Sequence, residues 1–405
     1  MRRRAALASL AAAPLAGFLA GCGGEKGDAP DGADSGEATP APEPAEDDPT
    51  EDGATTEEPP PDPLAERVAA LTDRQAAGQL VLVGIHDSDE VPAGLITDHA
   101  VGGFFLLGRW ESAEAVSPMV TALRESDPEA TDGIGPLVAV DQEGGQVRVL
   151  RGDAMDDTPS AETLGEDGPD AVRDAYRLIG AGLADLGIGM DLAPVADVVD
   201  PDLGRANAPV GQLRRGFGTE PEHVGECVAA AVEGLAEHDV LASLKHFPGL
   251  GRVRENTDHS ADGITDEATA ADDAFLGAFT AGIDAGAASV MLSSAVYTRI
   301  DAENPAMFSY AVVTDLLRGQ LGFDQLVLTD DIGVAAAVQD VPVGERATRT
   351  LAAGGDAVLT ADPSLTPELI EAIEAWAAES EENAARVRES ATRMLRAKET
   401  LGLLG

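Results

Sequence analysis

Residues 245–260, KHFPGLGRVRENTDHS, combine titratable side chains with residues that favour turns. Lys245 and His246 stand side by side at the start of this stretch, and Asp258 and His259 stand side by side near its end. The Pro-Gly pair and the second glycine between them predict a loop. Lysine, histidine and aspartate are common proton-transfer groups in enzymes. The stretch therefore predicts a loop that takes part in catalysis or in binding.

Acidic side chains also follow apolar runs elsewhere in the chain. An aspartate after a strand often caps the next helix, which is a sufficient structural explanation for each case taken alone. Their repetition favours a shared pocket, because a barrel of parallel strands collects all its carboxyl ends on one face. The acidic residues concerned are Asp141, Glu143, Asp191, Asp197, Asp330, Asp331 and Asp362.

The elements that must position these residues alternate between strands and helices. Continuous apolar runs, as in parallel strands covered on both faces, are separated by stretches rich in Ala, Leu, Glu and Arg. This pattern predicts one α/β domain, a (β/α)8 TIM barrel, over residues 66–405. A doubly wound open sheet is the alternative, but the glycine-rich phosphate turn usual after its first strand is missing. The predicted strands are 79–86, 101–108, 137–145, 188–198, 240–249, 288–297, 325–333 and 356–362.

One helix between these strands carries a start signal in its sequence. Thr219 and Glu222 have the spacing of a capping box and precede the apolar run of the helix between the fourth and fifth strands. The spacing predicts that the Thr219 side chain caps this helix.

Five segments resemble, in order, the signature blocks of glycoside hydrolase family 3: VDQEGGQV, DLAPVADVVD, RRGFGTEPE, LKHFPGLG and VLTDDIG. The resemblance spans the predicted barrel and is strongest to the branch of single-barrel β-N-acetylhexosaminidases. It implies that Asp330 is the nucleophile and that Asp141, Arg215, Lys245 and His246 bind the sugar. We expect a carbohydrate substrate, no cofactor and no metal, since the other histidines lack metal-ligand spacing.

The opening loop departs from the family pattern at the group that would protonate the leaving oxygen. A retaining glycosidase needs this second group beside its nucleophile, and an Asp-Ser-His stretch supplies it in the single-barrel branch. Without gaps, those positions fall on Asn256, Thr257 and Asp258. Either His259 serves after a one-residue slip of the loop, or Asp258 is itself the acid. In a third interpretation the loop merely covers the barrel mouth.

Two smaller departures concern the sugar. Val149 stands where the family motif usually has an arginine, and we expect Arg148 or Arg151 to substitute for it. Ser294 stands where a histidine is usual. These changes leave the preference for acetamido sugars open.

The first residues predict export. Three arginines at positions 2–4 precede an apolar run that ends in Leu-Ala-Gly-Cys22, the pattern of a bacterial lipoprotein signal. We expect removal of residues 1–21 and lipidation of Cys22, which would anchor the chain to the cell membrane on its extracytoplasmic side. Residues 22–65 are rich in Gly, Pro and acidic residues and predict a disordered linker. Cys227 is the only other cysteine, so we expect no disulfide within the chain.

The chain is strongly acidic, with a formal net charge of −46. This charge argues against nucleic acid as a partner, because nucleic-acid affinity comes from neutralising phosphates. We interpret it as solvated surface and expect a monomer. The preferred hypothesis is a retaining glycoside hydrolase, a β-N-acetylhexosaminidase acting on cell-wall or chitin-type saccharides. The alternative is a catalytically weak carbohydrate-binding lipoprotein of the envelope, and a weaker one is a structural envelope protein.

Overall fold

The computed structural model describes residues 63–126 and 131–405. The predicted signal, Cys22 and residues 22–62 of the predicted linker lie outside the described residues. The first described element is helix α1 (Pro63–Ala70), so the predicted domain boundary at residue 66 lies inside a helix.

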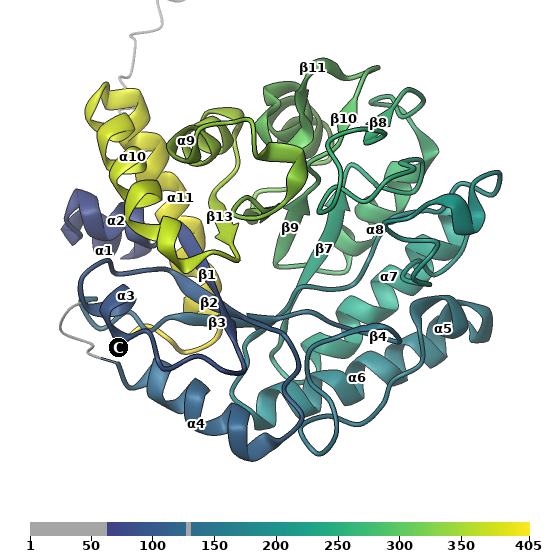
Figure 1. Cartoon of the computed structure of the whole chain (residues 1–405), viewed down its shortest axis with the longest axis horizontal. Coiled ribbons are helices and arrows are strands. Elements are labelled where there is room, and N and C mark those ends of the chain that lie inside the picture. The colour runs from purple at the N-terminus through teal and green to yellow at the C-terminus, as the bar shows by residue number, and fades with distance from the viewer. Residues whose placement is uncertain (1–62, 127–130) are drawn as a thin grey trace, which may run out of the picture. The chain divides into compact units, whose positions relative to one another are not determined.

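Eight parallel strands form a closed barrel (Figure 1). Each of them pairs with the barrel strands that come before and after it in the chain, and the last pairs with the first. The predicted (β/α)8 barrel is confirmed, and each barrel strand lies within one of the predicted runs. The strands are β1 (Val81–His86), β2 (Gly103–Leu107), β3 (Leu137–Val140), β6 (Met190–Asp191), β7 (Leu241–Phe247), β9 (Ser289–Leu292), β12 (Leu326–Asp331) and β13 (Ala357–Thr360).

Helices cover the outside of the barrel, and short strands and turns of 3₁₀-helix occupy the loops. The helices after α1 are α2 (Asp73–Gly78), α3 (Ala93–Thr97), α4 (Ala113–Arg124), α5 (Ala161–Asp167), α6 (Pro169–Asp185), α7 (Pro221–Ala236), α8 (Gly277–Asp284), the π-helix η4 (Ala311–Gln320), α9 (Val343–Ala353), α10 (Thr366–Ala378) and α11 (Glu381–Thr400). The loop strands are β4 (Gln142–Gly144), β5 (Val147–Arg148), β8 (Thr265–Asp266), β10 (Val296–Tyr297) and β11 (Asp301–Pro305). The 3₁₀ turns are η1 (Gly204–Ala206), η2 (Ala274–Leu276), η3 (Ala306–Phe308), η5 (Ala336–Val338) and η6 (Pro363–Leu365).

The barrel interior follows the two-residue period of its strands. On β12, Leu326 and Leu328 belong to an apolar cluster that fills the barrel. Asp330 is the next residue of the strand that faces inward, two positions further along. On β7, Leu241 belongs to that cluster, and Lys245 lies four residues further along the strand. On these two strands the inward positions are therefore apolar where the strand begins and charged where it ends.

Helix α11 closes the barrel at the ends where its strands begin. Met394 and Ala397 of α11 belong to the same apolar cluster as Leu241, Leu326 and Ala357, which stand at the start of three strands. The opposite end, where the strands finish, is the end at which a barrel carries its site.

The capping box predicted from Thr219 and Glu222 is wrong. Helix α7 begins at Pro221, and its N-cap is Glu220, whose side chain makes no capping hydrogen bond. Proline suits the first helical position because its φ is already helical and its missing N–H needs no partner there. The proline therefore determines the start of this helix.

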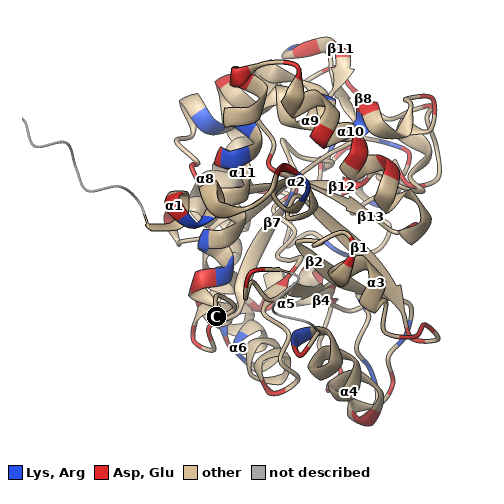
Figure 2. Ribbon diagram, turned by 90° about the vertical axis from the view of Figure 1, so that its left-hand side faces the viewer, with Lys and Arg blue, Asp and Glu red and all other residues tan. Residues whose placement is uncertain are grey.

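Acidic residues are spread over the helices and loops, and helix α11 carries several basic residues together with glutamates (Figure 2). Cys227 is buried in α7 and unpaired. Within residues 63–126 and 131–405, no helix combines the length and the apolar character required to cross a membrane.

Candidate active site

A cavity of about 510 Å³ opens where the barrel strands end. Its apolar walls include Phe105, Leu192, Met291 and Leu359, which come from β2, β6, β9 and β13 or directly follow them. All the residues predicted to act in catalysis or sugar binding line this one cavity, although their positions in the chain span nearly two hundred residues. They are Asp141, Arg215, Lys245, His246, Asp258, His259 and Asp330.

Lys245 and Arg215 are held on one side of the cavity by two carboxylates. The Lys245 ammonium lies 2.5 Å from Asp141 Oδ1 and 2.7 Å from Glu143 Oε1. Arg215 donates to Glu143 through Nε at 2.9 Å and through Nη2 at 2.8 Å, a bidentate pair. Burial by itself would raise the pKa of Glu143, but Arg215 and Lys245 together lower it to about 2. Glu143 is therefore ionised and holds both cations in place.

His246 is held in one orientation by Asp197, which is fully buried. Asp197 Oδ2 lies 2.8 Å from His246 Nδ1, and its Oδ1 accepts from the backbone N–H groups of His246 at 3.0 Å and Leu250 at 2.8 Å. On the other side of the ring, His246 Nε2 lies 3.3 Å from Arg215 Nη2. Because a guanidinium only donates, this contact assigns the proton of the neutral ring to Nδ1, where it is donated to Asp197.

Asp330 and Asp331, the neighbouring aspartates at the end of β12, have different roles. Asp331 accepts backbone N–H groups from Gly333 at 2.9 Å, Val334 at 2.9 Å and Ala361 at 2.7 Å, so its carboxylate holds the turn after β12 against the end of β13. Both aspartates line the cavity, but among the described residues Asp330 accepts a hydrogen bond only from the Asp331 backbone N–H, at 2.8 Å. Asp330 is thus the member of the pair available to a ligand.

The pKa of Asp330 is raised from 3.8 to about 6. Burial is the largest cause, and the negative charge of Asp258 is the next, whereas His246, the backbone N–H of Asp331 and Lys245 act in the opposite direction. Asp258 and Asp330 are thus two carboxyl groups that line the same cavity and interact electrostatically, and Asp330 carries the raised pKa.

The loop that carries Asp258 and His259 is attached to the segment after β12. The backbone N–H groups of Ala336 and Ala337 donate to the carbonyl oxygens of Asp258 and Thr257, both at 3.1 Å. The side chains of Asp258 and His259 are exposed at the cavity mouth and make no hydrogen bond to the described part of the chain. Both candidates for the acid therefore reach the site, and the choice between them stays open.

The expected replacement of the missing family arginine by Arg148 or Arg151 is wrong. Successive residues of a strand face opposite sides, so Val147 and Val149 line the cavity while Arg148 points away. Arg148 pairs with Asp157 at 2.5 Å, and Arg151 donates to the backbone carbonyl of residue 146 at 3.2 Å. This wall of the cavity is consequently apolar.

Glu143 and Asp197 are the positioning residues that the sequence interpretation left without a role. Both are among the acidic residues that follow the predicted strands. Their roles could have been predicted, because buried cations and a buried imidazole need carboxylate partners. Others of these acidic residues are structural. Asp191 accepts the backbone N–H of Gln142 at 3.0 Å, and burial raises its pKa well above the ordinary range. Asp362 caps η6 outside the cavity.

Comparison with known proteins agrees with this geometry. Residues 72–397 match the family model described as the glycosyl hydrolase family 3 N terminal domain. A beta-hexosaminidase of Xanthomonas oryzae pv. oryzae is 36% identical over 284 residues, which cover 68% of this chain and 80% of the relative. The crystal structure of a β-N-acetylhexosaminidase from Beutenbergia cavernae matches with a TM-score of 0.77 and 44% identity, and the match covers 82% of this chain and 99% of that one.

A family 3 β-N-acetylglucosaminidase from a Paenibacillus strain has a TM-score of 0.73 at 29% identity, over 82% of this chain and 63% of that one. The family model extends from α2 to α11 and so includes every strand of the barrel. A shared fold alone would leave the activity undecided, but here sequence identity and family model agree across the whole barrel. The chain belongs to glycoside hydrolase family 3 and is a glycosidase that hydrolyses O-glycosyl bonds.

Proposed function

We propose that this enzyme is a retaining β-N-acetylhexosaminidase that removes terminal β-linked N-acetylglucosamine-type residues from cell-wall or chitin-type saccharides. The observation that carries the proposal is the position of Asp330, a half-buried carboxyl group at the end of a barrel strand that lines the same cavity as a second carboxyl group, Asp258, on a loop. The names of the curated and structural relatives support the choice of sugar.

Asp330 acts as the nucleophile in the proposed reaction. Its carboxylate attacks the anomeric carbon, the bond to the leaving oxygen breaks, and a group on the 256–259 loop donates a proton to that oxygen. Water then attacks the same carbon, gives its proton to the loop group and displaces Asp330. Two inversions at one carbon return the original β configuration.

The charged side of the cavity binds the sugar hydroxyl groups in this proposal. Lys245 and Arg215 are donors held in place by Glu143, and the His246 ring is held in place by Asp197. Donors and acceptors that are positioned before the substrate arrives lose little entropy on binding, and they stabilise charge that develops in the transition state. Asp141, whose carboxylate is partly exposed, accepts from a hydroxyl group while it holds Lys245.

A saccharide-binding protein with weak turnover is the second candidate. It is favoured by one observation, the lack of any hydrogen bond from the Asp258 and His259 side chains to the described residues. A general acid works best when its position is determined by a neighbour. In this candidate function the cavity and its cations bind the sugar, and the 256–259 loop only covers the mouth of the cavity.

The test is a screen of nitrophenyl β-glycosides with the full-length chain, combined with proton NMR of the first product formed. The proposal expects turnover of the N-acetyl-β-glucosaminide with the β anomer appearing first. Asp330→Asn should abolish turnover and leave sugar binding measurable, whereas Asp362→Asn, at a strand end outside the cavity, should leave turnover unchanged. Saturable sugar binding without turnover of any glycoside would establish the second candidate instead.

We also propose that the enzyme works outside the cytoplasmic membrane, anchored through lipidated Cys22. The support is the sequence of residues 1–22, with its basic start, short apolar run and final cysteine.

A further inference from the structure

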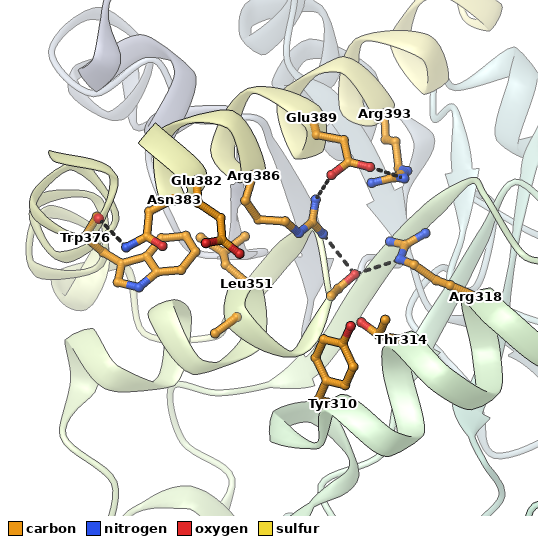
Figure 3. Close-up of a pocket in the computed structure, with 12 residues that line it drawn as sticks. Tyr310, Thr314, Arg318, Leu351, Trp376, Glu382, Asn383, Arg386, Glu389 and Arg393 are labelled. Atoms are coloured by element: carbon orange, nitrogen blue, oxygen red, sulfur yellow. Dashed lines mark hydrogen bonds and ion pairs between the residues drawn. The ribbon is translucent and has the colours of Figure 1, made fainter. Parts of the chain in front are cut away.

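A second cavity, of about 370 Å³, lies on the flank of the barrel between η4, α9, α10 and α11 (Figure 3). Its lining includes Gly354, which precedes β13, whereas the catalytic cavity includes Ala361, which follows β13. At about 3.3 Å per strand residue these positions are roughly 20 Å apart along the barrel. The second cavity is therefore separate from the catalytic mouth and lies toward the opposite end of the barrel.

Aromatic side chains distinguish this cavity from the rest of the surface. The chain has two tryptophans and three tyrosines. Trp110, Tyr176 and Tyr297 are buried, with exposed fractions of 2%, 0% and 1%. The remaining two, Tyr310 and Trp376, both line the flank cavity, and Tyr310 is 58% exposed. Every solvent-accessible tryptophan or tyrosine of the chain thus faces the same cavity.

The charges of this cavity cancel. Arg318, Arg386 and Arg393 all contact the buried carboxylate of Asp356, at 2.6, 2.9 and 3.2 Å. Glu389 pairs with Arg386 at 3.1 Å and with Arg393 at 2.6 Å. A third carboxylate in the cavity, that of Glu382, balances the third guanidinium.

The guanidinium groups are also occupied by backbone acceptors. Arg318 and Arg386 both donate to the carbonyl oxygen of Gly354, at 2.8 and 2.9 Å (Figure 3). Arginines with so few free N–H groups and no excess charge do not form an anion site. A neutral ligand fits this cavity better than a phosphate or a carboxylate.

Several polar groups in the cavity remain available. The Tyr310 hydroxyl, the Trp376 indole N–H and the Glu382 carboxylate make no hydrogen bond within the described parts of the chain. The π-helix η4 contributes Thr314 and Arg318 to the cavity, and Tyr310 directly precedes this helix. Turns of π-helix occur frequently at functional sites. Trp376 comes from α10, so two elements place one aromatic ring each at the cavity.

We propose that the flank cavity is an accessory site for a neutral saccharide, separate from the site of cleavage. A pyranose ring has apolar C–H faces and a polar edge, and the cavity offers aromatic surface beside free donors and acceptors. An accessory site of this kind retains a polymer while its chain end is cleaved at the barrel mouth. The existence of the site does not depend on the proposed specificity of the active site.

The test is a calorimetric titration of the full-length Asp330→Asn variant with chitotetraose. The inference expects two sites per chain. Adding Trp376→Ala or Tyr310→Ala should weaken the second site about tenfold or more, since ring contacts dominate such binding. Leu178→Ala, which removes another exposed apolar side chain outside the cavity, should leave both sites intact.

Turnover separates this inference from the proposed function. Trp376→Ala in the otherwise native chain should leave kcat/KM on a nitrophenyl monosaccharide unchanged and reduce turnover of insoluble chitin. A single site in the Asp330→Asn parent that both aromatic substitutions weaken would contradict the proposed specificity of the active site rather than the inference. The absence of any site that either aromatic substitution weakens, whether one or two sites are found, would overturn the inference. Displacement of the second saccharide by inorganic phosphate would overturn it as well, because the argument from charge balance requires a neutral ligand.

Discussion

Replacement of Asp258 by asparagine tests the interaction between the two carboxyl groups of the active site. Asp258→Asn keeps the size of the side chain and removes its charge. The negative charge of Asp258 raises the pKa of Asp330, second only to burial as a cause. The substitution should therefore lower the pKa of Asp330, so that the nucleophile is ionised at lower pH.

The size of the effect has an upper limit. The difference between 3.8 and about 6 in the pKa of Asp330 corresponds to about 3 kcal/mol. Burial is the largest cause and persists in the variant, so the pKa should decrease by only part of this interval. With a pKa near 6, about one tenth of Asp330 is ionised at pH 5, and a decrease of one pKa unit raises that fraction to about one half.

The assay is the pH dependence of kcat/KM on a nitrophenyl N-acetyl-β-glucosaminide, which reports ionisations of the free enzyme. An activated phenol needs little protonation, so loss of an acid at position 258 would not mask the result. The acid limb should lie near pH 6 in the native enzyme and at lower pH in Asp258→Asn. An unchanged limb would refute the interaction between Asp258 and Asp330, and a limb at higher pH would refute the sign of the argument.

Three further outcomes are expected. If His259 is the acid, His259→Ala should cost roughly 10²- to 10⁴-fold on a disaccharide and little on a nitrophenyl glycoside; equal small losses on both would exclude it. Burial lowers the pKa of Lys398 from 10.5 to about 7, with Gln79 as its hydrogen-bond partner. The unfolded chain then binds more protons between these values, so the free energy of unfolding should rise with pH from about 7 to 10.5. Denaturant titrations at several pH values should show that rise in the native chain and its loss in Lys398→Met. Cys22→Ala should move the protein from the membrane fraction to the soluble fraction without changing its melting temperature, and retention in the membrane would contradict the anchor.

The barrel strands could be located in the sequence because parallel strands are covered on both faces. Such strands become continuous apolar runs bounded by polar residues, and β2, β7 and β12 each lie inside one. The start of α7 was less predictable. Thr219 and Pro221 are both start signals two residues apart, and local preferences alone do not decide which one determines the first turn.

The sequence by itself determined the order of the strands, the residues at their carboxyl ends and the family motifs that assign a nucleophile to Asp330. These properties depend on local composition and on a period of two residues, which can be read along the chain. The same period separates Val149, which lines the cavity, from Arg148, which does not, but only the folded chain shows which of the two faces inward.

Only the tertiary structure decided which charged groups hold one another. Glu143 joins Lys245 to Arg215, and Asp197 orients His246, across long separations in the chain. The tertiary structure also decided that the Asp331 carboxylate accepts backbone N–H groups around the turn after β12, whereas Asp330 lines the cavity with acceptor capacity to spare. The physical reason is that barrel closure brings the carboxyl ends of distant strands together. A buried charge then takes whichever partner lies within hydrogen-bond distance, and nothing local in the sequence specifies that distance.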